Sequence, residues 1–485
     1  MLAGLTLLPI WSHEFLPLQD YPNHLARNYI IANYDGLPAL RQFYQVKFSI
    51  LPNLAMDVLV PGLSRGVGIE AAGKVMLSLC LLSVTSGTVA LNYALFGRFN
   101  VLPLCSFLLV FNQAFLKGFV NFSFGAGLAL WGVALWLLSE RWNRWVRLVG
   151  FSGLTVVLFF CHLYALGIYA VVVIAYEMAE VVRTRLYRKP WPNIALLQKL
   201  SFWVQFAIPV LLYRLSPTGS DAFGEPRWNS AVTKLKALWK LTDDYSLSLG
   251  VLTLIVVMLL PLLGTLLKQL QFSRNMGWPL VTLALLYIAL PKELSTSANA
   301  DWRLLVPLSF LWIASFQPCV QRRQYGWLGG VGLAAVAILL SVRISVVQSI
   351  WASYQPTYQA VTACIAQLEP GQRLFTAMAH ENYDSAIPTM HLPTYAVIQK
   401  SALVPSLFAF ETQQPVQFQP PYQSLADQTR RTVYSGRRAI PWDTVLSQYD
   451  YVLLENKALF PSVPLAQLRP VHEAGDFTLL QVKRS

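Results

Sequence analysis

The chain alternates long apolar runs with short polar connections over most of its length. A helix needs about 20 apolar residues to cross a bilayer core. By that measure the runs predict spanning helices at roughly 75–95, 101–116, 122–138, 147–161, 163–181, 199–214, 248–267, 277–291, 304–319 and 326–346. The apolar stretch Met1–Trp11 is too short to cross alone. Either the natural start lies upstream, or a shortened first helix packs on its neighbours and brings the total from about 10 to 11.

Two regions break this pattern. The loop 12–70 contains Pro22–Tyr34 and Asn53–Gly62, two stretches with mixed apolar and polar faces that predict short interfacial helices. After about residue 350 the chain turns more polar, and short β-like runs alternate with helical stretches. We therefore expect a polytopic α-helical membrane domain over 1–349, followed by a C-terminal α/β or α+β domain over 350–485.

Composition and charge place these parts relative to the membrane. Hydrophobic residues make up 55% of the chain and charged residues only 13%, about half the share in soluble domains. Basic residues concentrate in every second short loop: Arg98, Arg141, Arg144, Arg147, Arg183, Arg185, Arg188, Lys189, Lys268, Arg274, Arg322 and Arg323. The positive-inside rule then predicts a protein of the bacterial inner (plasma) membrane, with the loop 12–70 and the C-terminal domain extracytoplasmic. The net charge of +13 is dispersed, which fits contact with membrane lipids and excludes nucleic acid as a partner.

Metal-binding signatures are weak. The five cysteines show no CxxC or Cys/His spacing, which excludes a disulfide framework and a structural zinc site. His380, Glu381 and Asp384 resemble metal ligands, but we interpret their loop as polar surface.

The segment from Asp20 to Arg27 gathers the first candidate site residues, Asp20, Asn23, His24 and Arg27. Pro22 suits the first turn of a helix, and helical spacing brings the acid, the imidazole and the guanidinium near one face. A structural interpretation stays open for each residue. Asp20 is also a candidate helix cap, His24 a hydrogen-bonding group at the interface, and Arg27 a side chain reaching the headgroups.

Further polar residues collect at helix ends on the same expected side. Asp301 and Arg303 precede an apolar span, while Lys117 and His162 lie in short outer turns. Ionisable groups at membrane depth tend to face a cavity or a partner. As alternatives, Asp301 and Arg303 pair with each other, and Lys117 and His162 are structural. A shared pocket would need all of these groups on one side, as the topology predicts.

This layout resembles the GT-C glycosyltransferases, in particular bacterial relatives of protein mannosyltransferases and of the aminoarabinose transferase that modifies lipid A. The shared features are a short first helix, a large outer loop with an early acid, ten further spans and an outer C-terminal domain. The resemblance implies that Asp20 sits at the reaction centre and that Arg303 contacts the phosphate of a lipid-linked donor. The family often carries paired acids, whereas Asp20-Tyr21 supplies one carboxylate. A divalent metal, Mg²⁺ or Mn²⁺ held by Asp20 and His24, therefore stays open.

The residue types suit sugar transfer from a polyprenyl-phosphate donor to a lipid, glycan or protein acceptor. Asp20 is the candidate base for the acceptor hydroxyl. Arg303 and Arg27 are candidate phosphate contacts, supported by Asn23, His24, Lys117, His162 and Asp301 as substrate-binding residues. Two other hypotheses are a transporter or flippase of lipid-linked glycans and a non-catalytic scaffold with this fold. A transporter should show paired helix breaks in two matching halves.

Overall fold

The computed structural model describes residues 1–186, 202–219, 226–242, 245–293, 299–319, 322–378, 386–433, 440–460 and 462–484. Within these ranges, six helical segments are long and apolar enough to cross a membrane. They are α5 (Ile69–Phe96), α7 (Val120–Leu138), α8 (Arg144–Cys161), α9 (Leu163–Leu186), the run α13 (Leu247–Leu254), η6 (Ile255–Leu259) and α14 (Leu260–Leu266), and α17 (Arg322–Ala366).

Shorter apolar helices complete the bundle. They are α1 (Leu2–Ser12), η1 (Leu102–Leu109) with α6 (Gln113–Leu116), η3 (Phe202–Phe206) with α11 (Ala207–Leu215), α15 (Gly277–Ala289), and η8 (Trp302–Leu304) with α16 (Leu305–Ala314). Each predicted spanning run overlaps one of these helices or helical runs, although six of the described segments are long enough to cross a membrane. The polytopic α-helical membrane fold is therefore confirmed.

Close packing of α5 against α7 forms the centre of the bundle. A Cβ atom at Gly127 of α7 would lie 2.2 Å from the Ser83 Oγ of α5, so only glycine permits this approach. Small residues commonly line the contacts between membrane helices, because they allow the close approach that van der Waals packing requires. The hydrophobic effect does not drive helices together inside a bilayer.

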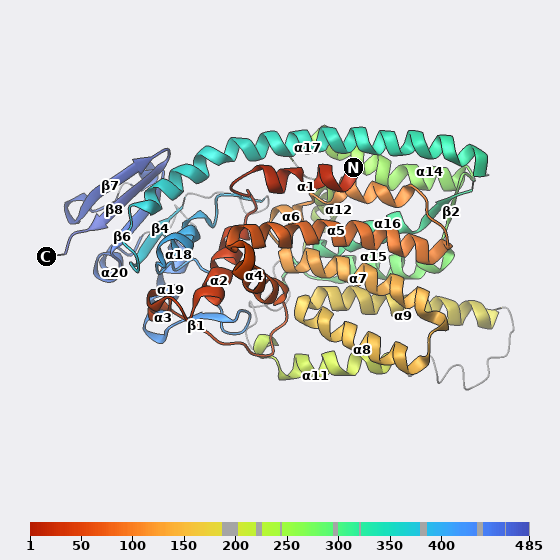
Figure 1. The fold of residues 1–485 in the computed structure, drawn as a ribbon, viewed down its shortest axis with the longest axis horizontal. Helices are drawn as coiled ribbons and strands as arrows, with labels where there is room; N and C mark the ends of the chain where they lie inside the picture. The colour runs from red at the N-terminus through yellow and green to blue at the C-terminus, as the bar shows by residue number, and fades with distance from the viewer. Residues whose placement is uncertain are drawn as a thin grey trace.

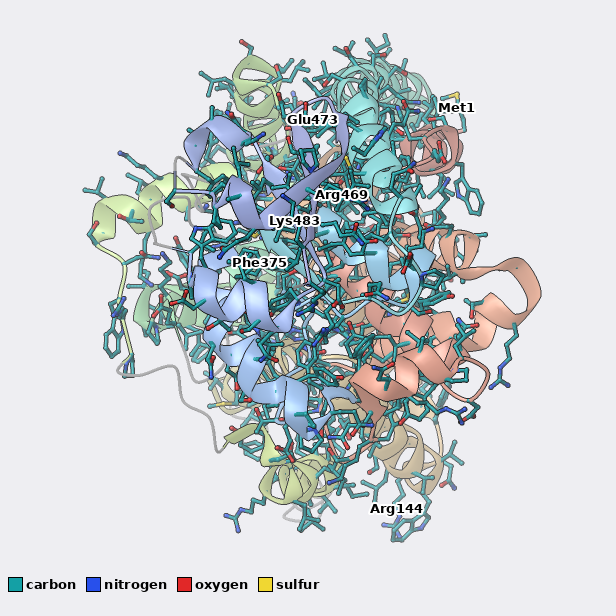
Figure 2. All side chains as sticks on the ribbon, turned by 90° about the vertical axis from the view of Figure 1, so that its left-hand side faces the viewer. Met1, Arg144, Phe375, Arg469, Glu473 and Lys483 are labelled. Atoms are coloured by element: carbon teal, nitrogen blue, oxygen red, sulfur yellow. The ribbon has the colours of Figure 1, made fainter. Side chains whose placement is uncertain are left out.

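The C-terminal part is a mixed sheet covered by helices. Its strand order is β4-β6-β8-β7, from the strands β4 (Leu374–Ala377), β6 (Tyr451–Glu455), β7 (Leu468–Ala474) and β8 (Phe477–Val482). β4 and β6 are parallel, whereas β8 is antiparallel to both β6 and β7. Seen from that end of the molecule, the sheet lies in front of the bundle, with Arg469, Glu473 and Lys483 towards the viewer (Figure 2). The expected small C-terminal sheet domain is confirmed.

The loop 12–70 and the C-terminal part are folded together. The loop forms α2 (Tyr21–Asn33), α3 (Pro38–Phe43), β1 (Tyr44–Val46) and α4 (Ala55–Val67). β1 pairs antiparallel with β5 (Val416–Phe418), and Tyr44 Oη donates to the Ala402 carbonyl at 2.9 Å. Ala26, Ile30 and Phe43 also share one apolar core with the C-terminal sheet. The predicted domain boundary between residues 349 and 350 falls inside α17, which continues without a break into the C-terminal part.

The two ends of the elongated molecule differ (Figure 1). α2, α3, α4 and the C-terminal sheet gather at one end, which we call the site end. The strand pair β2 (Leu270–Phe272) and β3 (Phe316–Pro318) lies at the other, which we call the far end. The candidate residues of the loop 12–70 therefore lie where the bundle meets the C-terminal sheet.

Candidate active site

Asp20 stands at the start of α2 without capping it. The helix begins at Tyr21, with Pro22 in its first turn, and the Asp20 side chain makes no cap hydrogen bond. Instead its Oδ1 lies 3.4 Å from His391 Nε2 and accepts a hydrogen bond from Gln19 Nε2 at 3.2 Å. Within the described ranges, Oδ2 carries no recorded hydrogen bond, and the side chain keeps 13% of its surface exposed. The interpretation of Asp20 as a helix cap is therefore excluded.

The surroundings keep Asp20 ionised. Burial acts to raise its pKa, but the hydrogen bond with His391, with smaller contributions from His24 and Gln19, lowers the pKa below the ordinary 3.8. His24 has the opposite character. Burial first, and then the charge of Arg27, lower the pKa of His24 to about 3, so its imidazole is neutral at physiological pH.

A tight turn between α6 and α7 holds the backbone of Asp20. The Lys117 carbonyl accepts the Asp20 N–H at 3.1 Å, and the Leu116 carbonyl accepts the Gln19 N–H at 3.0 Å. Gly118 has a φ of +79°, and a Cβ there would lie 2.9 Å from the Asp20 nitrogen. Only glycine satisfies both conditions. The turn thereby brings Lys117, which is 4% exposed, beside the acid.

Arg303 supplies a cation to the same site. Its guanidinium carbon lies 4.0 Å above the Phe119 ring and 5.8 Å from the Tyr164 ring centroid. The guanidinium also interacts electrostatically with the Asp20 carboxylate. This interaction is consistent with the two side chains facing one pocket. Among the described residues, Arg303 Nε, Trp302 Nε1 and His24 Nδ1 are buried without a hydrogen-bond partner. Such atoms are uncommon in folded proteins, and a catalytic role or a bound water or ion can account for them.

His162 faces this cation from the turn between α8 and α9. Its Nδ1 accepts the Tyr164 N–H at 3.1 Å, which leaves the Nε2 position for the proton of a neutral ring. Burial and then the nearby Arg303 charge lower the pKa of His162 to about 3. The structure thus places His24, His162, Arg303 and the backbone of Lys117 around Asp20. Their roles in binding a substrate stay predictions.

Arg27 has a different position from the expected one. It forms a two-pronged ion pair with Asp57 of α4, Nε to Oδ1 at 2.6 Å and Nη2 to Oδ2 at 2.9 Å, and both side chains are 0% exposed. A guanidinium committed in this way ties α2 to α4. The expectation that Arg27 contacts a donor phosphate is corrected on this ground, as is the alternative that it reaches the headgroups. Of the Arg27 side-chain nitrogens, Nη1 alone is left buried without a hydrogen-bond partner among the described residues.

Two other candidates have their polar atoms occupied by protein partners. Asp301 accepts the Trp302 N–H at 2.8 Å and an Asn229 hydrogen bond at 2.9 Å, and lies 3.4 Å from Lys234 Nζ. It pairs with Lys234 rather than with Arg303. Asn23 is 0% exposed and uses both ends of its amide on the C-terminal part. The expected substrate contacts of Asp301 and Asn23 are corrected accordingly.

The donor set does not suit a divalent metal. No group of three or more His, Cys, Asp or Glu side chains with metal-binding geometry occurs in the described part of the chain. Asp20 and His24 alone offer one carboxylate and one imidazole, whereas Mg²⁺ favours oxygen ligands in octahedral geometry. His380, Glu381 and Asp384 lie outside the described residues.

His391 is the site residue that the sequence pattern does not reveal. It is 3% exposed and precedes η9 (Leu392–Thr394) in the C-terminal part. Nothing in its local sequence distinguishes it from the other histidines of the chain. The signal is three-dimensional, because β1–β5 pairing and the contacts of Asn23 bring this segment onto α2.

Comparison with known proteins places the whole architecture. No protein-family model matches the chain, and no curated protein matches it in sequence. Among solved structures, ArnT from Cupriavidus metallidurans bound to undecaprenyl phosphate aligns over 99% of this chain and 96% of its own, with a TM-score of 0.58. The chain has the ArnT fold. The apo ArnT structure aligns over 98% of this chain and 95% of its own, with a TM-score of 0.53.

The likeness to ArnT is structural. Sequence identity is 10% in both alignments. The alignments nevertheless cover the membrane helices and the C-terminal part together. The fold expected from the sequence, an α-helical membrane bundle with a C-terminal sheet part, is therefore confirmed in its ArnT-like form.

Proposed function

We propose that this protein is a glycosyltransferase that moves a sugar from a polyprenyl-phosphate donor to a lipid, glycan or protein acceptor. The observation that carries the proposal is an ionised Asp20 within electrostatic reach of Arg303 at the site end of an ArnT-like fold. ArnT binds undecaprenyl phosphate, and a lipid of that class is the donor carrier that we assign here.

The reaction follows from the two groups. The acceptor hydroxyl attacks the anomeric carbon of the donor sugar while its proton passes to Asp20 Oδ2. The bond between that carbon and the phosphate oxygen breaks, and the electron pair leaves with polyprenyl phosphate. Arg303 stabilises the growing negative charge on the phosphate, for which a guanidinium is well suited. A carboxylate with a lowered pKa is a weak base, so proton transfer occurs late, as the attacked hydroxyl becomes acidic.

We place the reaction on the extracytoplasmic face of the bacterial inner membrane. In support, basic residues gather at the far end, where Arg98 donates to Gln317 Oε1 at 2.7 Å and to the Pro318 carbonyl at 2.6 Å. The positive-inside rule favours the cytoplasm for that end. Asp20 and the C-terminal sheet then lie outside.

Replacement of Asp20 tests the assignment. Purified protein would be incubated with a panel of undecaprenyl-phosphate sugars and native membrane extract as acceptor, and released undecaprenyl phosphate would be quantified by mass spectrometry. Asp20→Asn should reduce release to background with an unchanged unfolding temperature. Full activity of that variant would exclude Asp20 as the base.

The flippase alternative makes a different prediction. If no donor releases undecaprenyl phosphate, while vesicles containing the protein move a lipid-linked sugar between leaflets, the protein is a transporter. The position of the polar groups at one end of the bundle argues against this. Transport sites commonly lie near the bilayer midplane.

A further inference from the structure

His391 is held in one orientation by its surroundings. Its carbonyl accepts hydrogen bonds from the Thr394 N–H at 3.1 Å and from Thr394 Oγ1 at 2.7 Å, which fix the backbone at the start of η9. Its ring packs edge-on against Phe408, with centroids 4.8 Å apart. The two ring nitrogens then face different partners, Asn23 on one side and Asp20 on the other.

The amide of Asn23 cannot be turned around. Its Oδ1 accepts the Phe408 N–H at 2.7 Å, and its Nδ2 donates to the Ser406 carbonyl at 2.8 Å. Flipping the amide would set donor against donor at Phe408 and acceptor against acceptor at Ser406. Because Asn23 is 0% exposed, water offers no replacement partners.

The fixed amide determines the proton position on His391. Asn23 Nδ2 lies 3.1 Å from His391 Nδ1 and presents its second hydrogen there. Nδ1 must therefore act as the acceptor. A neutral ring then carries its proton on Nε2, which faces Asp20 Oδ1 at 3.4 Å.

We propose that Asn23 and His391 form a positioning pair that directs an N–H donor at Oδ1 of Asp20 and leaves Oδ2 free to face the substrate. The importance of this pair for sugar transfer rests on the proposed function, whereas its effect on the Asp20 carboxyl does not. Neither residue exchanges a proton with the substrate. Both act through Asp20, and His391 makes the C-terminal part a component of the active site.

Other ionisable groups also act on Asp20, so the test must separate their effects from the effect of His391. His24 belongs to α2 itself, and Arg303 comes from η8. Both remain in place when His391 is replaced. His391→Phe keeps an aromatic ring against Phe408 and removes both nitrogens. His391→Gln retains a side-chain N–H donor, and His472→Phe in β7 provides a matched control far from the acid.

The experiment measures the protonation of Asp20 directly in the full-length protein. Dicyclohexylcarbodiimide, an apolar reagent that attacks protonated carboxyls, would be added at pH 6, and adducts at Asp20 and Asp57 would be quantified by peptide mass spectrometry. Loss of the donated hydrogen bond raises the protonated fraction of Asp20 about tenfold for each unit of pKa. We expect about tenfold faster labelling of Asp20 in His391→Phe, a near-normal rate in His391→Gln and in His472→Phe, and an unchanged rate at Asp57.

Two outcomes would overturn the proposal. The first is an unchanged Asp20 labelling rate in His391→Phe. The second is an equal increase in His391→Phe and His391→Gln, which would indicate altered packing rather than a lost donor. Labelling uses no donor lipid, so its result stands even if no sugar transfer is found. Where transfer is found, His391→Phe should lower kcat at least tenfold with little change in KM, because the substrate does not touch the ring.

Discussion

Arg27 and Asp57 form a fully buried, two-pronged ion pair that joins α2 to α4 in the loop 12–70. Its members are 30 residues apart in the chain. Because Arg27 lies one turn after His24, this contact also sets how α2 presents the residues of its first turn to the site.

Breaking this ion pair should destabilise the protein strongly. Asp57→Asn leaves a buried guanidinium without its counter-charge, and we expect a loss of about 3–5 kcal/mol in the free energy of unfolding. The double variant Arg27→Met/Asp57→Leu should recover most of that loss, since it buries no charge. Unfolding temperatures in detergent measure both effects. If the double variant folds normally but no longer binds undecaprenyl phosphate, Arg27 has a ligand role after all.

Gly118→Ala should reduce sugar transfer beyond the loss that strain in the Gly118 backbone would cause by itself. A left-handed conformation disfavours alanine by about 1–2 kcal/mol, and the new Cβ would also press on the Asp20 backbone. Gly97→Ala is a matched control, because Gly97 has a φ of +67° and open space around it. We expect similar stability losses from backbone strain in both variants, and a strong loss of sugar transfer in Gly118→Ala only. Equal activity of the two would contradict the contact.

Arg303 should determine binding of the lipid phosphate. Hydrogen bonds to charged groups contribute about 1.5–3 kcal/mol, so Arg303→Met should weaken undecaprenyl phosphate binding by roughly 10- to 150-fold. Arg147→Met is the control. The Arg147 guanidinium lies 3.9 Å from the Trp136 ring centroid, as the Arg303 guanidinium lies 4.0 Å from that of Phe119. Arg147 is near the start of α8, however, whereas the end of α8 is next to the site. Equal losses in the two variants would point to general destabilisation.

The neutral histidines predict acid lability. The folded-state pKa of His162, at about 3, lies below its ordinary value of 6.5, so protons bind the unfolded chain first as the pH falls. Stability should therefore drop below pH 6.5, by up to about 1.4 kcal/mol per pH unit for this residue. His24 acts in the same direction. The fall in melting temperature between pH 7.5 and pH 5.0 should be smaller in His162→Gln than in the parent protein, with the remainder due to His24. An unchanged slope in that variant would contradict the prediction.

The sequence predicted the parts of the site that depend on topology. Apolar runs identify the spanning helices, and the charges of the loops indicate which loops lie on the same side of the membrane. Asp20, Lys117, His162 and Arg303 were therefore expected on one side of the membrane. Arg27 was expected in the pocket because the sequence did not reveal its partner. That partner, Asp57, lies on another helix, and no local sequence pattern predicts how the two helices pack. His391 was missed for the same reason. Tertiary pairing decides which of several suitable side chains meet.

The contact between Asn23 and His391 also has a consequence for biosynthesis, because the two residues are 368 positions apart. At the usual elongation rate of about 5–20 residues per second, the ribosome makes His391 roughly 20 to 70 seconds after Asn23. During that interval the nascent chain carries Asp20 without its partner. Under our assignment, sugar transfer by the growing chain stays slow until the segment with His391 has been exported and has docked on α2.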